Sequence, residues 1–474
     1  MQDRDIPLCV DLDGTLLRSD LLFESALSLI RANPLSVIHM AIWLIAGGKA
    51  NLKRQIAQRT TLDVSVLPYE TRVLGWLREE NGGRRKILCS ASDQTLVDAV
   101  ARHVGGFDEA LGSDGVRNLA GVNKGETLSS LYGEKRFDYA GNAGVDQHVW
   151  NRARRAVLVN APPSLQRHAQ TAYEVERVFE RESVGPRTWL KALRLHQWLK
   201  NLLVFLPLLT AHQLFTPGFA QRAAVAFLSF GLCASATYII NDLLDLDADR
   251  RHRTKRARPF ASGALQIRDG LMAAPLLLLA AFALAFALSP RFALVLLGYC
   301  VLTLAYSLSI KRVAVLDVVA LAALYTIRII AGTVAIGIDA SFWLLAFSMF
   351  LFLSLAMIKR YTELRGLLAD GRSHASGRGY SVEDLPLVQS LGAASGYLSV
   401  LVCALYINST ASELLYGRPQ VLWLLCPLLL YWISRAWLIA HRGEMHDDPV
   451  VFAVTDPVSR IVVAICAVVV LLAI

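Results

Sequence analysis

The stretch Asn241-Asp242-Leu243-Leu244-Asp245-Leu246-Asp247-Ala248-Asp249 follows a long apolar run, Ala223 to Ile240, and is itself followed by a run rich in Lys and Arg. Asp242, Asp245 and Asp249 are spaced i, i+3 and i+7, so on a continuous helix they share one face. Three carboxylates this close repel one another unless a cation lies among them, and Mg²⁺ commonly bridges protein carboxylates to a substrate diphosphate. The stretch therefore predicts a Mg²⁺ and diphosphate site at the mouth of a membrane helix, with the basic run holding the remaining phosphate charge.

Continued to Arg258-Pro259-Phe260-Ala261-Ser262-Gly263, this stretch resembles the first aspartate-rich motif of the UbiA superfamily of intramembrane prenyltransferases. The alternative is an ordinary helix end whose acids face water and whose bases mark the cytoplasmic side. The pattern Asn-Asp-x-x-Asp-x-x-x-Asp in this position is more specific than that. The resemblance implies an all-α membrane bundle of nine transmembrane helices, with the chemistry in the loops after the second and the sixth.

Composition separates two parts of the chain. Its 474 residues are 54% hydrophobic, too apolar for a soluble protein, and the formal charge of +9 is explained by basic loops at a membrane surface without invoking nucleic acid. The charged start Met1–Asp5 does not predict a signal peptide. We expect a soluble α/β domain over residues 1–182, a linker and interfacial helix over 183–200, and a membrane transferase domain over 201–474.

The soluble part begins with a short apolar strand, Ile6–Val10, that runs into Asp11-Leu12-Asp13-Gly14-Thr15. This resembles the first motif of the haloacid dehalogenase (HAD) phosphatase superfamily. The chemistry suits the spacing, because Asp11 would attack phosphorus and Asp13, two residues on, points to the same side and would protonate the leaving group. The alternative is a strand and turn with two solvated acids.

The later HAD motifs follow in order, which favours the phosphatase interpretation. By resemblance, Ser90 binds phosphate, Lys124 neutralises phosphate and nucleophile, and Asp146 joins Asp11 and Asp13 in binding Mg²⁺. The resemblance implies a Rossmannoid sheet with a helical cap inserted at about residues 17–85. One departure is Asn142, where the family often has Asp. The apolar cap segment Pro34–Ala46 is too short to span a bilayer, so it either lies on the membrane or packs within the cap.

The membrane part contains nine apolar segments, and most Lys and Arg residues lie in the loops after the second, fourth, sixth and eighth of them. Because basic loops stay on the cytoplasmic side, this distribution favours a cytoplasmic N-terminal domain and a C-terminus on the far side. Asp317 and Arg328 lie in apolar surroundings, and we interpret them as functional unless they form an internal pair. The nine segments centre on Leu202–Leu214, Phe219–Ile240, Leu271–Ser289, Phe292–Ile310, Val313–Ile336, Ser341–Ile358, Leu387–Ile407, Val421–Ala440 and Val458–Ile474.

Short patterns within this part are similar to the decaprenyl-phosphate phosphoribosyltransferase group, which joins polyprenyl phosphate to phosphoribosyl diphosphate. That similarity implies an integral inner-membrane transferase with the lipid chain among its helices. The candidate substrate-binding residues are Lys200, Asn201, Asn241, Lys255, Arg258, Tyr306, Lys311, Asp317, Arg328, Lys359, Arg360 and Glu363.

Two alternatives remain open. The first is conventional transfer from a prenyl diphosphate to an aromatic acceptor, which uses the same metal motif. The second is a non-catalytic transporter or scaffold, which leaves the aspartate motif unexplained. For the preferred reaction, we hypothesise that the HAD domain removes the phosphate that remains on the lipid-linked ribose.

Overall fold

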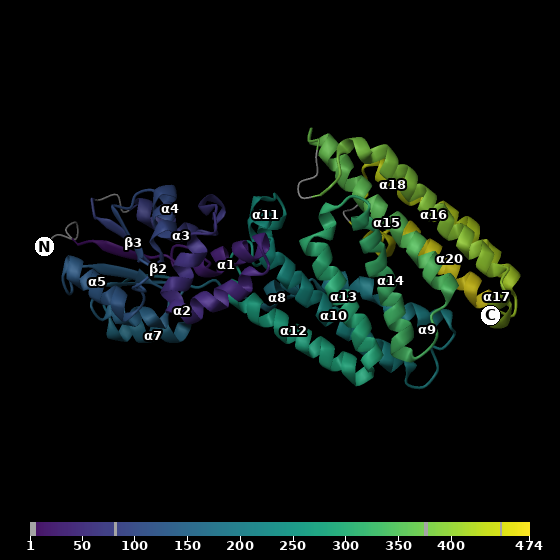
Figure 1. Cartoon of the computed structure of the whole chain (residues 1–474), viewed down its shortest axis with the longest axis horizontal. Coiled ribbons are helices and arrows are strands. Elements are labelled where there is room, and N and C mark those ends of the chain that lie inside the picture. Colours follow the sequence, from purple (N-terminus) through teal and green to yellow (C-terminus); the bar gives the residue numbers. More distant parts are fainter. Residues whose placement is uncertain (1–5, 80–82, 374–377, 446–447) are drawn as a thin grey trace. The chain divides into compact units, whose positions relative to one another are not determined.

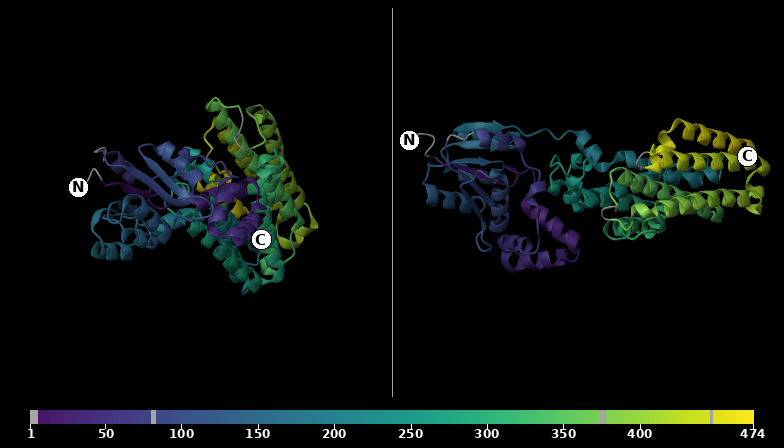
Figure 2. Two further views of the ribbon diagram at one scale, coloured as in Figure 1. Left: turned by 60° about the vertical axis from the view of Figure 1, so that its left-hand side comes forward. Right: turned by 90° about the horizontal axis from the view of Figure 1, so that it is seen from above.

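The computed structural model describes the whole chain except residues 1–5, 80–82, 374–377 and 446–447 (Figures 1 and 2). The stretch Met1–Asp5, for which we predicted no signal peptide, therefore lies outside the described residues. The chain forms two compact units: a first unit of residues 1–193 and 238–274, and a second unit of residues 194–237 and 275–474. Residues 238–274 belong to the first unit although they lie within the predicted membrane domain. The predicted division between residues 182 and 183 therefore stays a prediction.

A six-stranded parallel sheet organises the α/β part of the first unit, in the order β3-β2-β1-β4-β5-β6. Its strands are short and largely buried, and β1 lies at the centre between β2 and β4, pairing Leu8 with both Lys86 and Asp138. In chain order they are β1 (Leu8–Asp11), β2 (Lys86–Asp93), β3 (Glu109–Ser113), β4 (Asp138–Gly141), β5 (Ala156–Val159) and β6 (Val175–Phe179). The chain reverses its winding direction at β1, where open α/β sheets place their ligand crevice.

Helices cover both faces of this sheet, because alternate strand residues point to opposite sides. Leu8 and Val10 pack in a core with residues of α3 (Thr71–Glu79) and α4 (Gln94–Val104). Cys9 packs in a second core with residues of α5 (Val122–Tyr132), α6 (Gln147–Trp150) and α7 (Pro163–Ala172). The arrangement is a three-layer α/β/α domain.

The insertion between β1 and β2 is helical, as the sequence predicted for the cap. It contains α1 (Leu21–Ala32), α2 (Ser36–Ala57), a 3₁₀ turn at Val64–Val66 and α3. Asp20 caps α1 by accepting a hydrogen bond from the Leu22 backbone N–H, a common helix start. The first unit ends its N-terminal part with α8 (Pro186–Leu193), and it also holds α11 (Leu246–Arg251) and the 3₁₀ turn at Lys255–Ala257.

The second unit is all helical, and two of its helices, α10 and α12, continue into the first unit. Seven helices among the described residues are long and apolar enough to cross a membrane, or eight if the bent pair α19 (Pro449–Thr455) and α20 (Pro457–Ala473) counts as one. The seven are α10 (Phe219–Leu244), α12 (Ile267–Leu288), α13 (Pro290–Leu308), α14 (Leu316–Ile336), α15 (Phe342–Ala369), α16 (Leu385–Ile407, with its preceding 3₁₀ turn) and α18 (Leu425–Arg442, with its preceding 3₁₀ turn).

The structure thus does not reproduce nine long apolar helices, and the difference lies in the first predicted segment, Leu202–Leu214. The chain there forms a 3₁₀ stretch, Leu195–Phe205, followed by the five-residue α9 (Leu206–Thr210). Pro207 lies in the first turn of α9 and lacks the N–H that would continue the preceding helical hydrogen bonds. A second short helix, α17 (Thr410–Leu415), lies between α16 and α18.

Candidate active sites

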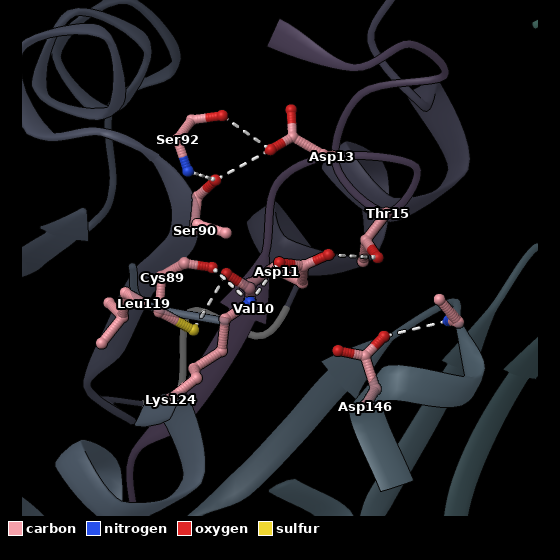
Figure 3. Close-up of polar contacts among 12 residues, drawn as sticks. Val10, Asp11, Asp13, Thr15, Cys89, Ser90, Ser92, Leu119, Lys124 and Asp146 are labelled. Atoms are coloured by element: carbon pink, nitrogen blue, oxygen red, sulfur yellow. Dashed lines mark hydrogen bonds and ion pairs between the residues drawn. The ribbon is translucent and has the colours of Figure 1, made fainter. Parts of the chain in front are cut away.

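Asp11, at the end of β1, lies beside Lys124 in the first unit, and Figure 3 shows the two side chains facing each other. Lys124 Nζ is 2.6 Å from Asp11 Oδ1, and the Thr15 hydroxyl donates to Asp11 Oδ2 at 3.4 Å. Burial raises the pKa of Asp11, Lys124 lowers it, and the carboxylates of Asp146 and Asp13 raise it again, to about 7 altogether. Burial and the neighbouring carboxylates therefore outweigh the effect of Lys124 on the pKa of Asp11.

Asp13 is fixed by three donors. Its Oδ1 accepts a hydrogen bond from the Leu21 backbone N–H at 2.8 Å. Its Oδ2 accepts from the hydroxyls of Ser90 at 2.9 Å and Ser92 at 2.8 Å (Figure 3). The predicted phosphate-binding residue Ser90 therefore lies next to the predicted acid, as the motif order implied.

Asp146 joins the same cluster through a buried tyrosine. Lys124 Nζ donates to the Tyr139 hydroxyl at 3.0 Å, and that hydroxyl donates to Asp146 Oδ1 at 2.9 Å. Asp146 Oδ2 accepts from the backbone N–H groups of Asn142 and Ala143, both at 2.9 Å. Burial alone would lower the pKa of Lys124, but Asp11 raises it, so the lysine stays charged.

The described residues contain no group of three or more His, Cys, Asp or Glu side chains already arranged around one metal position. The donor chemistry nevertheless fits Mg²⁺, because three carboxylates meet at the end of the sheet and each retains lone pairs beyond its present hydrogen bonds. The repulsion that raises the pKa of Asp11 is also what a divalent cation would relieve.

Sequence reasoning missed three residues of this site. Ser92 follows Ser90 at the strand period of two, so the alternation of β2 could have revealed it. Tyr139, in β4, looked like an ordinary core residue. Lys53 lies in the cap, and its Nζ donates to the Ala91 carbonyl at 2.6 Å and to Asn118 Oδ1 at 3.3 Å. No local sequence pattern around Lys53 predicts these contacts.

The aspartate-rich stretch is not one continuous helix. α10 ends at Leu244, Asp245 is non-helical with φ −101° and ψ 15°, and α11 begins at Leu246. The expectation that Asp242, Asp245 and Asp249 share one helix face is therefore wrong, because that face requires an uninterrupted helix.

The break turns Asp242 and Asp249 toward one point. Arg258 Nη1 lies 3.1 Å from Asp242 Oδ1 and 2.5 Å from Asp249 Oδ2, and both carboxylates are almost fully buried. Asp245 Oδ1 is instead 3.7 Å from Arg31 Nη2 of α1. Two predicted ligands thus converge on a single cation position, which a guanidinium nitrogen occupies, and this convergence fits a divalent ion. Asn241 lies half-buried at the end of α10, and Lys255 follows in an exposed 3₁₀ turn.

A buried ion pair joins α11 to the cap within the first unit. Arg250 binds Glu24 of α1 through both terminal nitrogens, at 3.0 and 2.6 Å, and the two side chains are 4% and 1% exposed. Arg250 Nε also donates to the Ala261 carbonyl at 2.9 Å. A second pair, Arg251 with Asp63 at 2.6 Å, is exposed. We call the Glu24–Arg250 pair the cap clamp.

A small pocket of about 70 Å³ lies at the edge of the HAD-like site in this unit. Gly14 and Asn142 line it from the α/β part, and Gly263, Ala264 and Gln266 line it from the loop that follows the aspartate-rich stretch. The loop that follows the aspartate-rich stretch thus forms part of the wall of a pocket beside the predicted phosphatase site.

The second unit holds a separate network of buried charges. Asp317, at the start of α14, lies 2.5 Å from Arg360 of α15 and accepts a hydrogen bond from the Tyr380 hydroxyl at 2.8 Å. Arg360 also pairs with Glu363, which Arg378 binds at 3.1 Å. The side chains of Asp317 and Arg360 are both 0% exposed, so each depends on the other for its charge.

Arg328 belongs to a different cluster from Asp317, which excludes the Asp317–Arg328 pair that we considered. Its Nε donates to Asn201 Oδ1 at 2.9 Å, and its Nη2 donates to the Tyr299 hydroxyl at 3.0 Å. Lys200 pairs with Asp448, a residue that the sequence did not single out.

The remaining predicted residues lie at the borders of these clusters. Arg378 Nη1 donates to the Tyr306 hydroxyl at 3.2 Å, which brings Tyr306 to the Asp317 network. Lys311 lies in the 3₁₀ turn after α13 and Lys359 beside Arg360 on α15, and both are half-buried.

Comparison with known proteins decides the family. Residues 202–456 match the model of the UbiA prenyltransferase family. The chain belongs to the UbiA prenyltransferase family. This UbiA-family chain is a multi-pass integral membrane transferase, and it is 38% identical over 98% of its length to uncharacterized protein y4nM of Sinorhizobium fredii, covering 90% of that protein. It is also 41% identical over 37% of its length to decaprenyl-phosphate phosphoribosyltransferase of Mycolicibacterium smegmatis, covering 57% of that protein.

Solved structures resemble the two parts of this UbiA-family chain separately. A UbiA homologue from Archaeoglobus fulgidus bound to GPP and Mg²⁺ has a TM-score of 0.45 and 19% identity, and the match covers 60% of this chain and 99% of that one. A phospho-aspartyl intermediate analogue of phosphoserine phosphatase has a TM-score of 0.26 and 14% identity, with 38% and 95% covered. The family match over residues 202–456 confirms the resemblance of the membrane part to the UbiA family, and the N-terminal region is similar to a phosphatase structure at low identity.

The cap clamp leads to a prediction about stability. Glu24→Ala leaves the buried Arg250 without its counter-charge and should lower the free energy of unfolding by about 3 kcal/mol or more. The matched control is Asp63→Ala, which breaks the exposed Arg251 pair and should cost less than about 1 kcal/mol. Thermal unfolding of the detergent-solubilised chain, followed by tryptophan fluorescence, measures both. Equal melting temperatures for the two variants would contradict a buried clamp.

Proposed function

We propose that this UbiA-family chain joins a polyprenyl phosphate to phosphoribosyl diphosphate in a Mg²⁺-dependent reaction. The observation that carries the proposal is the convergence of Asp242 and Asp249 on one cation position at the end of a membrane helix. A second line of support is the similarity to decaprenyl-phosphate phosphoribosyltransferase, whose name gives a polyprenyl phosphate and a transferred phosphoribosyl group.

In the proposed step, a phosphate oxygen of the lipid attacks C1 of the ribose, the bond from C1 to the diphosphate breaks, and diphosphate leaves with the electron pair. Bound Mg²⁺ would offset the charge that builds on the leaving diphosphate. Asp242 and Asp249 would hold the cation, Asp245 is the third candidate ligand, and Asn241 would orient the diphosphate. Arg258 and Lys255 then bind phosphate oxygens, which adds charge-assisted hydrogen bonds to the leaving group.

The charged clusters of the second unit are the remaining candidate substrate contacts. Arg360 Nη2 already pairs with Asp317, but Arg360 Nε is buried and makes no hydrogen bond within the described part of the chain, so it is a donor available to an anionic group. We assign Asp317, Glu363 and Tyr306 to holding Arg360 and its neighbours in place. Lys200, Asn201, Lys311, Arg328 and Lys359 are proposed to supply further contacts to phosphate or sugar.

Removing either converging carboxylate tests the transfer reaction. Asp242→Asn and Asp249→Asn keep the side-chain shape but remove the charge that binds the cation, so transfer should fall by more than about 100-fold. The control is Asp247→Asn, which removes the same charge from the same stretch and should leave transfer within a few-fold of the original chain.

The assay uses purified chain with Mg²⁺ and offers two substrate pairs: polyprenyl phosphate with phosphoribosyl diphosphate, and a prenyl diphosphate with hydroxybenzoate. Product from the second pair alone would replace the proposal with conventional prenyl transfer, the alternative that the family description favours. Unchanged transfer in both Asp variants, or in excess chelator, would refute the metal site.

We propose further that the HAD-like part hydrolyses the 5-phosphate of the lipid-linked ribose that the transfer step produces. Asp11 attacks the phosphorus, the bond to the ribose 5-oxygen breaks, and that oxygen takes a proton from Asp13. Water then gives a proton to Asp13 and attacks the phosphorus of the phospho-aspartate, which releases phosphate and restores both Asp11 and Asp13. Lys124 and Ser90 bind the phosphate, and Asp11, Asp13 and Asp146 would hold Mg²⁺. The pocket shared with the Gly263–Gln266 loop supports a common substrate.

The product made by Asp11→Asn tests this second activity. The variant should transfer at the normal rate but accumulate lipid-linked ribose that retains its phosphate, whereas the original chain releases free phosphate and the dephosphorylated lipid. Mass spectrometry of the extracted lipids distinguishes the two products. If both proteins release the same phosphorylated lipid, the two activities are not consecutive.

We also propose nine membrane crossings, with the N-terminal part in the cytoplasm and the C-terminus on the far side. The first crossing would be the interrupted segment Leu195–Thr210. Eleven 3₁₀ residues rising about 2.0 Å each and five α-helical residues rising about 1.5 Å each span about 30 Å, the thickness of the hydrocarbon core.

Cysteine labelling in intact cells tests this topology. A cysteine at Ala264, exposed in the loop after the aspartate-rich stretch, should resist an impermeant maleimide added from outside. A cysteine at Phe215, which is 93% exposed between α9 and α10, should react. Labelling in the reverse pattern, or of both positions, would contradict the proposal.

A further inference from the structure

Helix α2 in the cap is broken into two halves that have different surroundings. The break lies at Gly47 and Gly48, and Gly48 has φ +68°, a conformation that suits glycine. The second half buries Ala50, Leu52 and Ile56 against the rest of the cap. The first half contributes few side chains to that core, so it is a separate structural feature.

The first half of α2 exposes large apolar side chains on much of its surface. Ile38 is 60% exposed, Ile42 55% and Ile45 86%. Only Met40 and Trp43 from this half pack against the small core with α1. We call the exposed set the α2 apolar surface; it consists of Leu35, Val37, Ile38, Ile42, Leu44 and Ile45. So large an apolar surface on a water-facing domain marks an interaction site.

The residues around this surface are basic, which favours an anionic bilayer as its partner. Between Glu24 and Asp63 the sequence has no acidic residue, while its basic residues are Arg31, Lys49, Lys53, Arg54 and Arg59. Arg59 stacks over Trp43 at 4.7 Å, which places a cation and an amphipathic ring side by side next to the apolar surface. Apolar side chains bordered by bases and an indole ring are typical of helices that lie in the interface of an anionic bilayer.

The position of α2 in the first unit favours the same partner. Arg31 of α1 lies 3.7 Å from Asp245, which directly follows the end of the membrane helix α10. Leu35 is four residues beyond Arg31, so its Cα is within about 14 Å of the Arg31 Cα. The α2 apolar surface thus begins on the same side of the first unit as the C-terminal end of α10, a helix long and apolar enough to cross a membrane.

We propose that the first half of α2 inserts its apolar surface into the boundary between headgroups and acyl chains of an anionic bilayer. The six apolar side chains enter the lipid, while Lys49 and Arg59 remain among the phosphates. Of the two sequence-based alternatives for this segment, the exposure of these six side chains favours the membrane surface, while Met40 and Trp43 hold the helix against the cap. The proposal does not rest on the HAD-like part being an active phosphatase.

Site-directed fluorescence on the full chain in vesicles tests the proposal. Ile42→Cys and Ile45→Cys are labelled with an environment-sensitive fluorophore, and the protein is reconstituted into phosphatidylcholine and phosphatidylglycerol. The control is Leu131→Cys on α5, which is 53% exposed and outside the cap. Since all three side chains are exposed, the substitutions should not disturb folding, and the chain without an added cysteine gives the background from its own seven cysteines.

The fluorophores at residues 42 and 45 should emit at shorter wavelength than the control and lose most of their intensity when brominated phosphatidylcholine is used. Replacing phosphatidylglycerol with phosphatidylcholine should weaken this quenching, because the bases lose their anionic partners. Water-like emission at both positions would overturn the proposal. A blue-shifted emission that brominated lipid does not quench would also overturn it, since a protein surface would then cover α2.

Discussion

Arg258 Nη1 lies between Asp242 Oδ1 and Asp249 Oδ2, and without a cation in that position the two buried carboxylates would repel each other. The chain is non-helical at Asp245, between α10, which carries Asp242, and α11, which carries Asp249. Buried carboxylates are paired with a cationic side chain in the other charged clusters as well. Lys124 pairs with Asp11 in the first unit, and Arg360 pairs with Asp317 in the second. In each of these clusters, a positively charged side chain pairs with a buried carboxylate.

The cap clamp gives the aspartate-rich stretch a fixed support. Arg250 is the residue after Asp249, so holding Arg250 with a bidentate buried Glu24 restricts where the Asp249 carboxylate lies. A buried pair adds little net stability over an apolar contact, but losing one partner is costly, so such a pair fixes one arrangement against others. The HAD-like part therefore contributes to the geometry of the stretch through Glu24 and Arg31, apart from any hydrolysis that it performs.

Local patterns predicted much of this structure. The strand that ends in Asp11 and the order of Ser90, Lys124 and Asp146 indicated one cluster, because the ends of parallel strands meet at one edge of a sheet. The apolar runs predicted the long membrane helices. The break at Asp245 could not be predicted, since Leu244 and Leu246 suit a helix equally well, and tertiary contacts decide such a point.

Ion pairs between residues far apart in the sequence could not be predicted from one sequence. Glu24 and Arg250 are 226 positions apart, and one sequence shows no period that links them. The same holds for Asp317, whose partner is Arg360 and not the nearer Arg328. The prediction of one long helix in the first membrane segment was wrong for another reason. The segment is apolar as expected, but Pro207 prevents a single continuous helix.

Asn142 shows how the amount of charge in the HAD-like site is limited. A Cβ built on Gly14 would lie 2.0 Å from Asn142 Nδ2, so the amide packs directly over the turn that follows Asp13. Burial and the neighbouring carboxylates already raise the pKa of Asp11 to about 7. An aspartate at position 142 would add a further negative charge to this cluster, in which Lys124 already pairs with Asp11. The amide keeps an oxygen that can coordinate a metal but adds no repulsion, so the proposed Mg²⁺ site would bind its cation less tightly than a site with aspartate at position 142.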